Sequence, residues 1–217
     1  MKKIDYLEEY KVVLGYVGVL TMIIGFVTII PLFILVFFNN ESQYAIDFII
    51  PSIIALLFGY LLKRNIKLKE KYKLSVYQDA VIVVLTWLIA CFFSSIPWIL
   101  SKQLNFTQAY FESVSGWTTT GLSVINPLLT PNIYLFHRSI TLFFGGVGLV
   151  LVMVSALSAT FGLRLYNSEG HSDRLLPNLL KSSRLIMSIY AGYILAGTLL
   201  YIFFGMNWFH AINNSIA

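Results

Sequence analysis

Three threonines and a glycine in a row, Thr118, Thr119, Thr120 and Gly121, are the residues that could do chemistry on a small cation. A potassium ion that has lost its water shell is held in a pore by a ring of carbonyl oxygens. Threonine favours the extended backbone that aims such carbonyls at one axis. Glycine adopts a positive φ without placing a side chain in the pore. The run therefore predicts one strand of a selectivity filter or, as the simpler alternative, a polar loop.

The segment before this run has the pattern of a short helix over residues 107–116, with Asn105 or Thr107 as N-cap. Its apolar face is formed by residues at helical spacing: Phe106, Tyr110, Phe111, Val114 and Trp117. A helix this short cannot cross a bilayer, but it can enter the membrane and return if the backbone that follows faces protein or water. Its C-terminal end, which carries partial negative charge, would then point toward the ion.

The composition indicates a membrane protein. Of 217 residues, 58% are apolar and only 12% are charged, about half the charged fraction of soluble domains. The apolar residues form long charge-free runs at residues 12–38, 48–62, 80–100, 139–161 and 185–204. We therefore expect an all-α membrane protein with five transmembrane helices plus a re-entrant pore helix and filter loop.

Basic residues predict the orientation, because lysine and arginine concentrate on the cytoplasmic side. The N-terminus and the loops after the second and fourth runs hold 13 of the 15 lysines and arginines. The opposite side holds only Lys102 and Arg138. This distribution predicts a multi-pass protein of the plasma (inner) membrane with a cytoplasmic N-terminus. It also argues against nucleic acid as a partner, because the basic residues flank membrane spans.

The sequence also contains an internal repeat. Residues 104–113 align with residues 206–215 at a constant offset of 102, with identities at Asn105/Asn207, Ala109/Ala211 and Ser113/Ser215. The repeat predicts four parts: an N-terminal helix pair with a basic cytosolic loop (1–75), a first helix–pore–helix repeat (76–162), a cytosolic loop (163–184) and the start of a second repeat (185–217). On this alignment the sequence ends inside the second pore helix, which is expected of a fragment or a truncated gene product.

Two motifs resemble a known family. Residues 111–122, FESVSGWTTTGL, resemble the first pore loop of the Trk/Ktr/HKT potassium transporters. Residues 136–139, followed by Gly145, Gly146 and Gly148, are similar to the start of the helix after that loop. The resemblance covers essentially the whole chain, which would be the N-terminal half of a bacterial Trk-type membrane subunit. It implies four channel-like helix–pore–helix repeats around one pore.

The resemblance also implies roles for individual residues. The first of four filter strands would consist of Thr118, Thr119, Thr120, Gly121 and Leu122, with potassium at Thr119, Thr120 and Gly121. A glycine at position 121 is the potassium-permissive choice of the family, whereas serine there is associated with sodium-selective plant members. Glu112 and Ser115 would support the pore helix. Partners would be a second copy, as a homodimer, and a cytosolic nucleotide-binding regulatory subunit facing residues 163–184.

Two further residues leave alternatives open. Glu112 could draw cations toward the pore, but we favour a role in which it hydrogen-bonds the filter backbone. Arg138 is expected to snorkel or to pair structurally rather than to contact ions. Close helix packing is the expected role of the glycines at positions 145, 146 and 148, with a gating hinge as the alternative.

The expected function is potassium uptake across the plasma membrane, driven by the membrane potential, with K⁺ as the transported ion and no cofactor in this chain. Two alternatives remain: a non-transporting membrane subunit that acts as a scaffold, and a secondary transporter of another solute. An enzyme is the least supported reading. His137, His171 and His210 lack metal-ligand spacing, and the sequence contains neither a catalytic triad nor a phosphate-binding loop.

Overall fold

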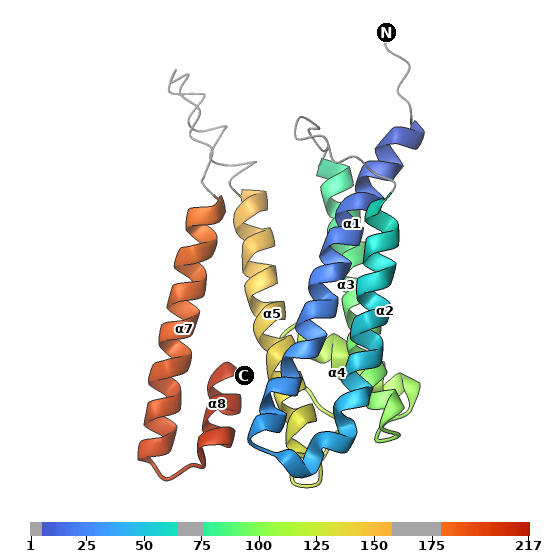
Figure 1. Ribbon diagram of the computed structural model, residues 1–217. Helices are drawn as coiled ribbons and strands as arrows, with labels where there is room; N and C mark the ends of the chain where they lie inside the picture. The colour runs from blue at the N-terminus through green and yellow to red at the C-terminus, as the bar shows by residue number, and fades with distance from the viewer. Residues whose placement is uncertain (1–5, 65–75, 158–178) are drawn as a thin grey trace, which may run out of the picture.

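The structure is a computed structural model that describes residues 6–64, 76–157 and 179–217. All regular structure in these ranges is helical, as expected from the sequence (Figure 1). The order is α1 (Tyr6–Ile29), η1 (Ile30–Val36), η2 (Asn39–Tyr44), α2 (Ala45–Arg64), α3 (Val76–Leu100), α4 (Phe106–Trp117), α5 (Asn132–Leu157), α7 (Leu179–Phe203) and α8 (Trp208–Ile216).

Four stretches of helix are long and apolar enough to cross a membrane: Tyr10–Val36, Asn39–Arg64, Tyr77–Leu100 and Leu185–Phe203. They coincide with four of the five runs expected from the sequence, and they support an integral membrane protein. The remaining run, residues 139–161, overlaps α5, and its far end lies outside the described residues.

Helices α1 and α2 pack closely because glycines face each other across their interface. A Cβ built on Gly18 would lie 2.7 Å from the carbonyl oxygen of Gly59, and one on Gly59 would lie 2.6 Å from that of Gly18. Further along the same interface, the Ser52 hydroxyl donates a hydrogen bond of 2.7 Å to the Gly25 carbonyl. Small residues allow this approach where the surrounding lipid is as apolar as a helix face.

Each of the first three membrane-length stretches of helix contains a proline. Pro31 stands at the beginning of η1, where the α-helical hydrogen-bond pattern of α1 ends. Pro51 and Pro97 lie inside α2 and α3, and both are fully buried. Neighbouring helices therefore surround the positions where each proline removes a backbone donor.

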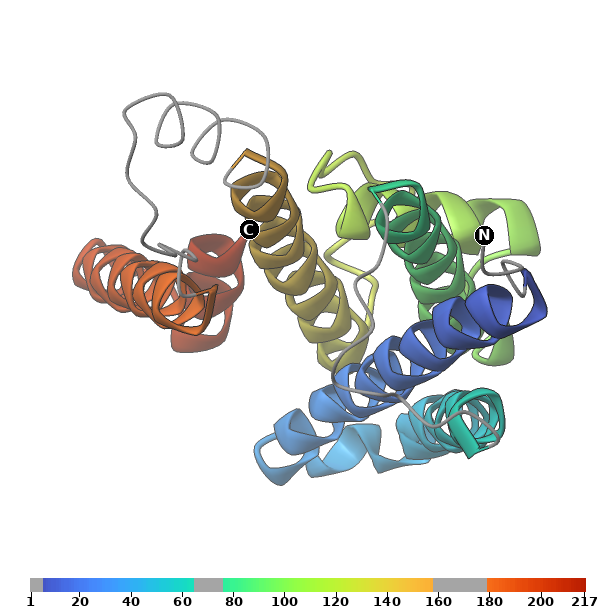
Figure 2. The same ribbon diagram turned by 90° about the horizontal axis from the view of Figure 1, so that it is seen from above.

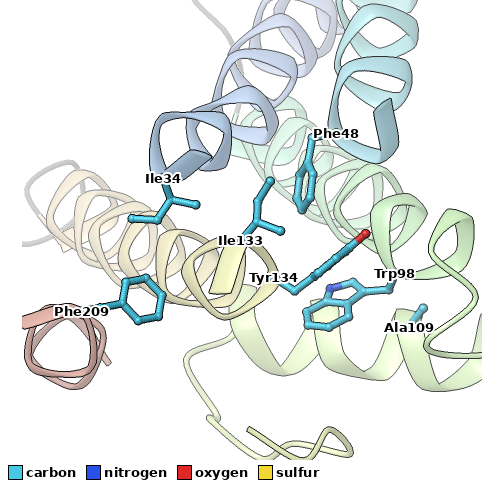
Figure 3. Close-up of a cluster of buried hydrophobic side chains, with 7 residues drawn as sticks. All are labelled: Ile34, Phe48, Trp98, Ala109, Ile133, Tyr134 and Phe209. Atoms are coloured by element: carbon cyan, nitrogen blue, oxygen red, sulfur yellow. The ribbon is translucent and has the colours of Figure 1, made fainter. Parts of the chain in front are cut away.

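A buried cluster near one end of the bundle joins six elements and holds the short helix α4 against the start of α5. It contains residues of η1, α2, α3, α4, α5 and α8: Ile34, Phe48, Trp98, Ala109, Ile133, Tyr134 and Phe209 (Figure 3). Beside this cluster the Tyr134 hydroxyl donates a 2.6 Å hydrogen bond to the carboxylate of Asp47. The first turn of α5 is thereby fixed relative to α2 and α4.

Helix α7 stands apart from the group formed by α1, α2 and α3, and α8 folds back between α7 and α5 (Figures 1 and 2). The contact between α8 and α5 includes a 2.6 Å hydrogen bond from the Ser139 hydroxyl to the side-chain oxygen of Asn213. Both segments of the internal repeat are short helices that begin after an asparagine, α4 after Asn105 and α8 after Asn207. The equivalent alanines, Ala109 and Ala211, are both buried.

Candidate functional site

Helix α4 begins with a reciprocal cap. The Asn105 side chain accepts the backbone N–H of Gln108 at 2.9 Å, and the Gln108 side chain accepts the backbone N–H of Asn105 at 3.2 Å. Two N–H groups that a helix start leaves unpaired are thus satisfied. Asn105 is therefore the N-cap, one of the two residues proposed from the sequence, and the helix begins at Phe106.

The buried face of α4 is not the apolar face seen in the sequence. The buried residues are small or polar: Ala109, Glu112, Ser113, Ser115 and Gly116. Phe106 and Phe111, on the apolar face, are 57% and 43% exposed. In a membrane protein an apolar face can point outward, because lipid is as apolar as a protein core. Periodicity alone therefore identified the helix but not the side that packs inward.

The last turn of α4 is held by close contacts with neighbouring helices. A Cβ on Gly145 of α5 would overlap the Trp117 carbonyl oxygen, and one on Gly116 would lie 2.5 Å from the Thr141 hydroxyl. The Trp117 indole N–H donates to the hydroxyl of Ser94 on α3 at 2.8 Å. These contacts fix the point from which the threonine run departs.

The threonine run begins as a turn rather than as an extended strand. The backbone N–H of Thr118 bonds the Val114 carbonyl at 2.9 Å, and that of Thr119 bonds the Gly116 carbonyl at 3.0 Å. Thr119 has a φ of 57° and Gly121 a φ of 78°. The extended backbone predicted for Thr118 and Thr119 was wrong, because their N–H groups still bond the last free carbonyls of α4.

The second half of the loop is tied back to α4 by Ser115. The backbone N–H of Gly121 donates to the Ser115 carbonyl at 3.3 Å, and the Ser115 hydroxyl donates to the Leu122 carbonyl at 2.5 Å. The loop therefore folds over the C-terminal turn of α4 and returns alongside it.

Glu112 holds the second part of the loop, at Ser123 and Val124, against α4. Its carboxylate accepts the Ser123 hydroxyl at 2.9 and 3.0 Å and the Val124 backbone N–H at 3.0 Å. It also pairs with the guanidinium of Arg138 on α5, with the Nε of Arg138 2.7 Å from Oε1. The Glu112 side chain is 1% exposed and that of Arg138 is 20% exposed.

Three backbone carbonyls in the first part of the loop accept no hydrogen bond among the described residues. Thr119, Thr120 and Gly121 are exposed and Thr118 is partly so. Within the described ranges, the carbonyls of Thr118, Thr119 and Thr120 accept no hydrogen bond, whereas Gly121 accepts one from Arg138. The Thr118 and Thr120 hydroxyls lie 2.7 Å apart. This surface offers neutral oxygens, the ligands that a weakly hydrated monovalent cation requires.

Among the described residues, the histidines form no metal site at this loop. His137 is buried, and one of its ring nitrogens lies 3.0 Å from the Ser94 carbonyl, while His171 lies outside the described residues. Among described residues no group of three or more histidine, cysteine or acidic side chains could hold a metal.

Sequence reasoning missed that Arg138 reaches Gly121. The sequence contained a hint of this contact. The chain is poor in charge, yet an acidic residue, Glu112, precedes the threonine run and a basic residue, Arg138, follows it. Such charges inside a membrane protein are usually paired.

Comparison with known proteins decides the family. The sequence model of the family TrkH, described as a cation transport protein, matches residues 44–215, well over half of the chain. The chain belongs to the TrkH family. The family is one of membrane transporters and not of enzymes. The resemblance drawn from the sequence is thus confirmed.

Individual TrkH-family relatives match along nearly the whole chain. An uncharacterised cation transporter of Methanocaldococcus jannaschii is 35% identical, and the match covers 95% of this chain and 43% of that protein. The Trk system potassium uptake protein TrkH of Escherichia coli K12 is 30% identical, covering 96% of this chain and 44% of that protein. The chain therefore spans less than half the length of these relatives.

The fold is also that of a solved family member. The crystal structure of the potassium transporter TrkH from Vibrio parahaemolyticus superposes with a TM-score of 0.81 at 24% identity. The match covers 95% of this chain and 42% of that structure.

Proposed function

We propose that this chain is the part of a potassium uptake protein that supplies the first of four filter strands, Thr118 to Leu122. The observation that carries the proposal is the set of unengaged carbonyls at Thr118, Thr119 and Thr120, directly after a short capped helix. Relatives named as potassium uptake proteins support K⁺ as the transported ion.

Within this strand, potassium binds at Thr119, Thr120 and Gly121. Glu112 and Ser115 support it, because their bonds to residues 122–124 hold the loop against α4. Ions would lose water at the carbonyls and move down the electrochemical gradient. The membrane potential supplies about 2.3 kcal/mol per charge per 100 mV.

The proposed topology has five crossings, with α5 as the additional span and α4 as a re-entrant pore helix. The location of 13 of the 15 basic residues supports a cytoplasmic N-terminus in the plasma (inner) membrane. Much of the basic loop after α2 and most of the loop at residues 163–184 lie outside the described residues.

The proposed partners are a second copy of the complete protein and a cytosolic regulatory subunit that binds nucleotide. The support for them is the family resemblance, which implies that residues 163–184 face such a subunit. The mass of the purified complete gene product in detergent tests for the second copy. A pull-down of that protein with a candidate nucleotide-binding subunit tests for the regulatory partner.

The transport test uses the complete gene product in proteoliposomes with an imposed potassium gradient. We expect potassium flux that exceeds sodium flux, and Gly121→Asp should abolish it by placing a charged carboxylate beside the carbonyls of the loop. Gly192→Ala on α7 is the matched control, because a Cβ there meets nothing within 4 Å.

Two results would support other functions. If the protein assembles with a full-length homologue but carries no ion, it acts as a scaffold. If Gly121→Asp changes affinity for an organic solute and leaves ion flux unchanged, the chain belongs to a secondary transporter of that solute.

A further inference from the structure

Arg138 makes two contacts at once through one rigid group. Its Nε donates to Oε1 of Glu112 at 2.7 Å, and its Nη2 donates to the carbonyl oxygen of Gly121 at 2.5 Å. The guanidinium is planar and its donors have a fixed spacing. The direction of the Gly121 carbonyl is therefore set by the place of Arg138 on α5 and by the carboxylate of Glu112 on α4.

A positive charge beside a cation site would normally repel the ion. Glu112 removes most of that repulsion, because its buried carboxylate lies in direct contact with the guanidinium. Glu112 also accepts the Val124 N–H on the far side of the turn. Arg138 can therefore act through its hydrogen bond without presenting a net charge to the loop.

Packing alone does not hold Gly121 in place. Its φ is 78°, and a Cβ placed on it would meet nothing within 4 Å, so no packing contact limits its movement on that side. The hydrogen bond from Arg138 supplies a restraint that packing does not. A carbonyl oxygen has two lone pairs, so this bond leaves Gly121 able to face an ion as well.

We propose that Arg138 is a positioning residue for ion selectivity: it holds the Gly121 carbonyl at a fixed distance, so that the carbonyl cannot move inward to bind an ion smaller than potassium. This inference rests on the proposed potassium transport and adds to it a determinant outside the filter motif. A sodium ion needs closer oxygens than potassium, and a carbonyl that is held in place cannot supply them.

The test compares variants of the complete gene product in proteoliposomes by their ratio of potassium to sodium flux. Arg138→Gln removes the charge and the two-point contact, and we expect the ratio to fall about tenfold. That factor corresponds to about 1.4 kcal/mol, the size of one hydrogen bond to a charged group.

Arg138→Lys keeps the charge and can pair with Glu112, but a single ammonium cannot also reach Gly121 in the same geometry. Its ratio should fall by a similar factor.

Lys102→Gln is the matched control, because Lys102 is the other basic residue assigned to this side. It is exposed and makes no ion pair among the described residues. Its flux ratio should equal that of the unchanged protein. Monodispersity in detergent, measured for every variant, reports assembly separately from selectivity.

Three results would overturn the proposal. The first is an Arg138→Lys protein that assembles and keeps the original flux ratio. The second is an Arg138→Gln protein that assembles and keeps the original flux ratio. The third is an unchanged protein that carries neither ion, in which case the proposed transport fails as well. Either of the first two results rejects this inference and leaves the proposed transport standing.

Discussion

The carboxylate of Glu41 accepts the backbone N–H of Ile133 at 2.9 Å, although the two residues are 92 positions apart. The same carboxylate accepts the backbone and side-chain N–H groups of Asn132, each at 2.9 Å. Glu41 therefore caps the start of α5 from a different part of the chain, next to the partial positive charge of the helix end. The N-terminal helix pair is thus tied to the helix that carries Arg138.

Glu41→Ala should destabilise the protein by about 3 kcal/mol, because three donors around a buried carboxylate lose their acceptor. The measurement is the apparent melting temperature of the complete gene product in detergent, which should drop by several degrees. Asp79→Ala is the control, since Asp79 is an exposed acidic residue in the first turn of α3. Equal melting temperatures for the two variants would contradict a capping role for Glu41.

Gly145→Ala should disrupt the loop, whereas Gly148→Ala should be tolerated. A Cβ at position 145 would overlap the Trp117 carbonyl oxygen, and one at position 148 would meet nothing within 4 Å. Away from such contacts, alanine is favoured over glycine in a helix by about 1 kcal/mol. We expect reduced potassium flux and a lower melting temperature only for Gly145→Ala. Similar behaviour of both variants would argue against close packing at Trp117.

Gly121→Ala should impair transport through backbone strain alone. The φ of 78° costs an L-residue roughly 1–2 kcal/mol, while the space around the glycine would accept a methyl group. Asparagine tolerates this conformation better than alanine. We therefore expect potassium flux to be highest in the unchanged protein, lower in Gly121→Asn and lowest in Gly121→Ala. A variant order set by side-chain size would point instead to steric limits in the loop.

Asn105→Ala should shorten or weaken α4 by removing its cap, at a cost of about 1 kcal/mol. Asn105→Asp retains an acceptor for the Gln108 N–H and should keep most of the stability. Hydrogen exchange of the amides in the first turn of α4 measures the effect. Unchanged exchange in Asn105→Ala would show that the buried cluster, and not the cap, fixes the helix start.

The family resemblance and the position of the candidate loop were predictable from the sequence, because both depend on residues adjacent in the chain. The motif around Thr118 to Gly121 is contiguous, and the cap at Asn105 depends on residues only three positions apart. Four of the expected spans were found as well, since a charge-free run of about 20 residues has few other solutions.

The sequence by itself thus determined the helices, their apolar character and the short capped helix before the threonine run. Only the tertiary structure decided which face of α4 is buried, since lipid and core select for the same apolar residues. It also gave Thr119 its positive φ and joined Arg138 to Gly121. These features depend on hydrogen bonds between α4, its loop and α5. Arg138 bonds Gly121, 17 positions away, and Glu112, 26 positions away. No local pattern specifies such pairings, because they arise only when packing brings the two helices together.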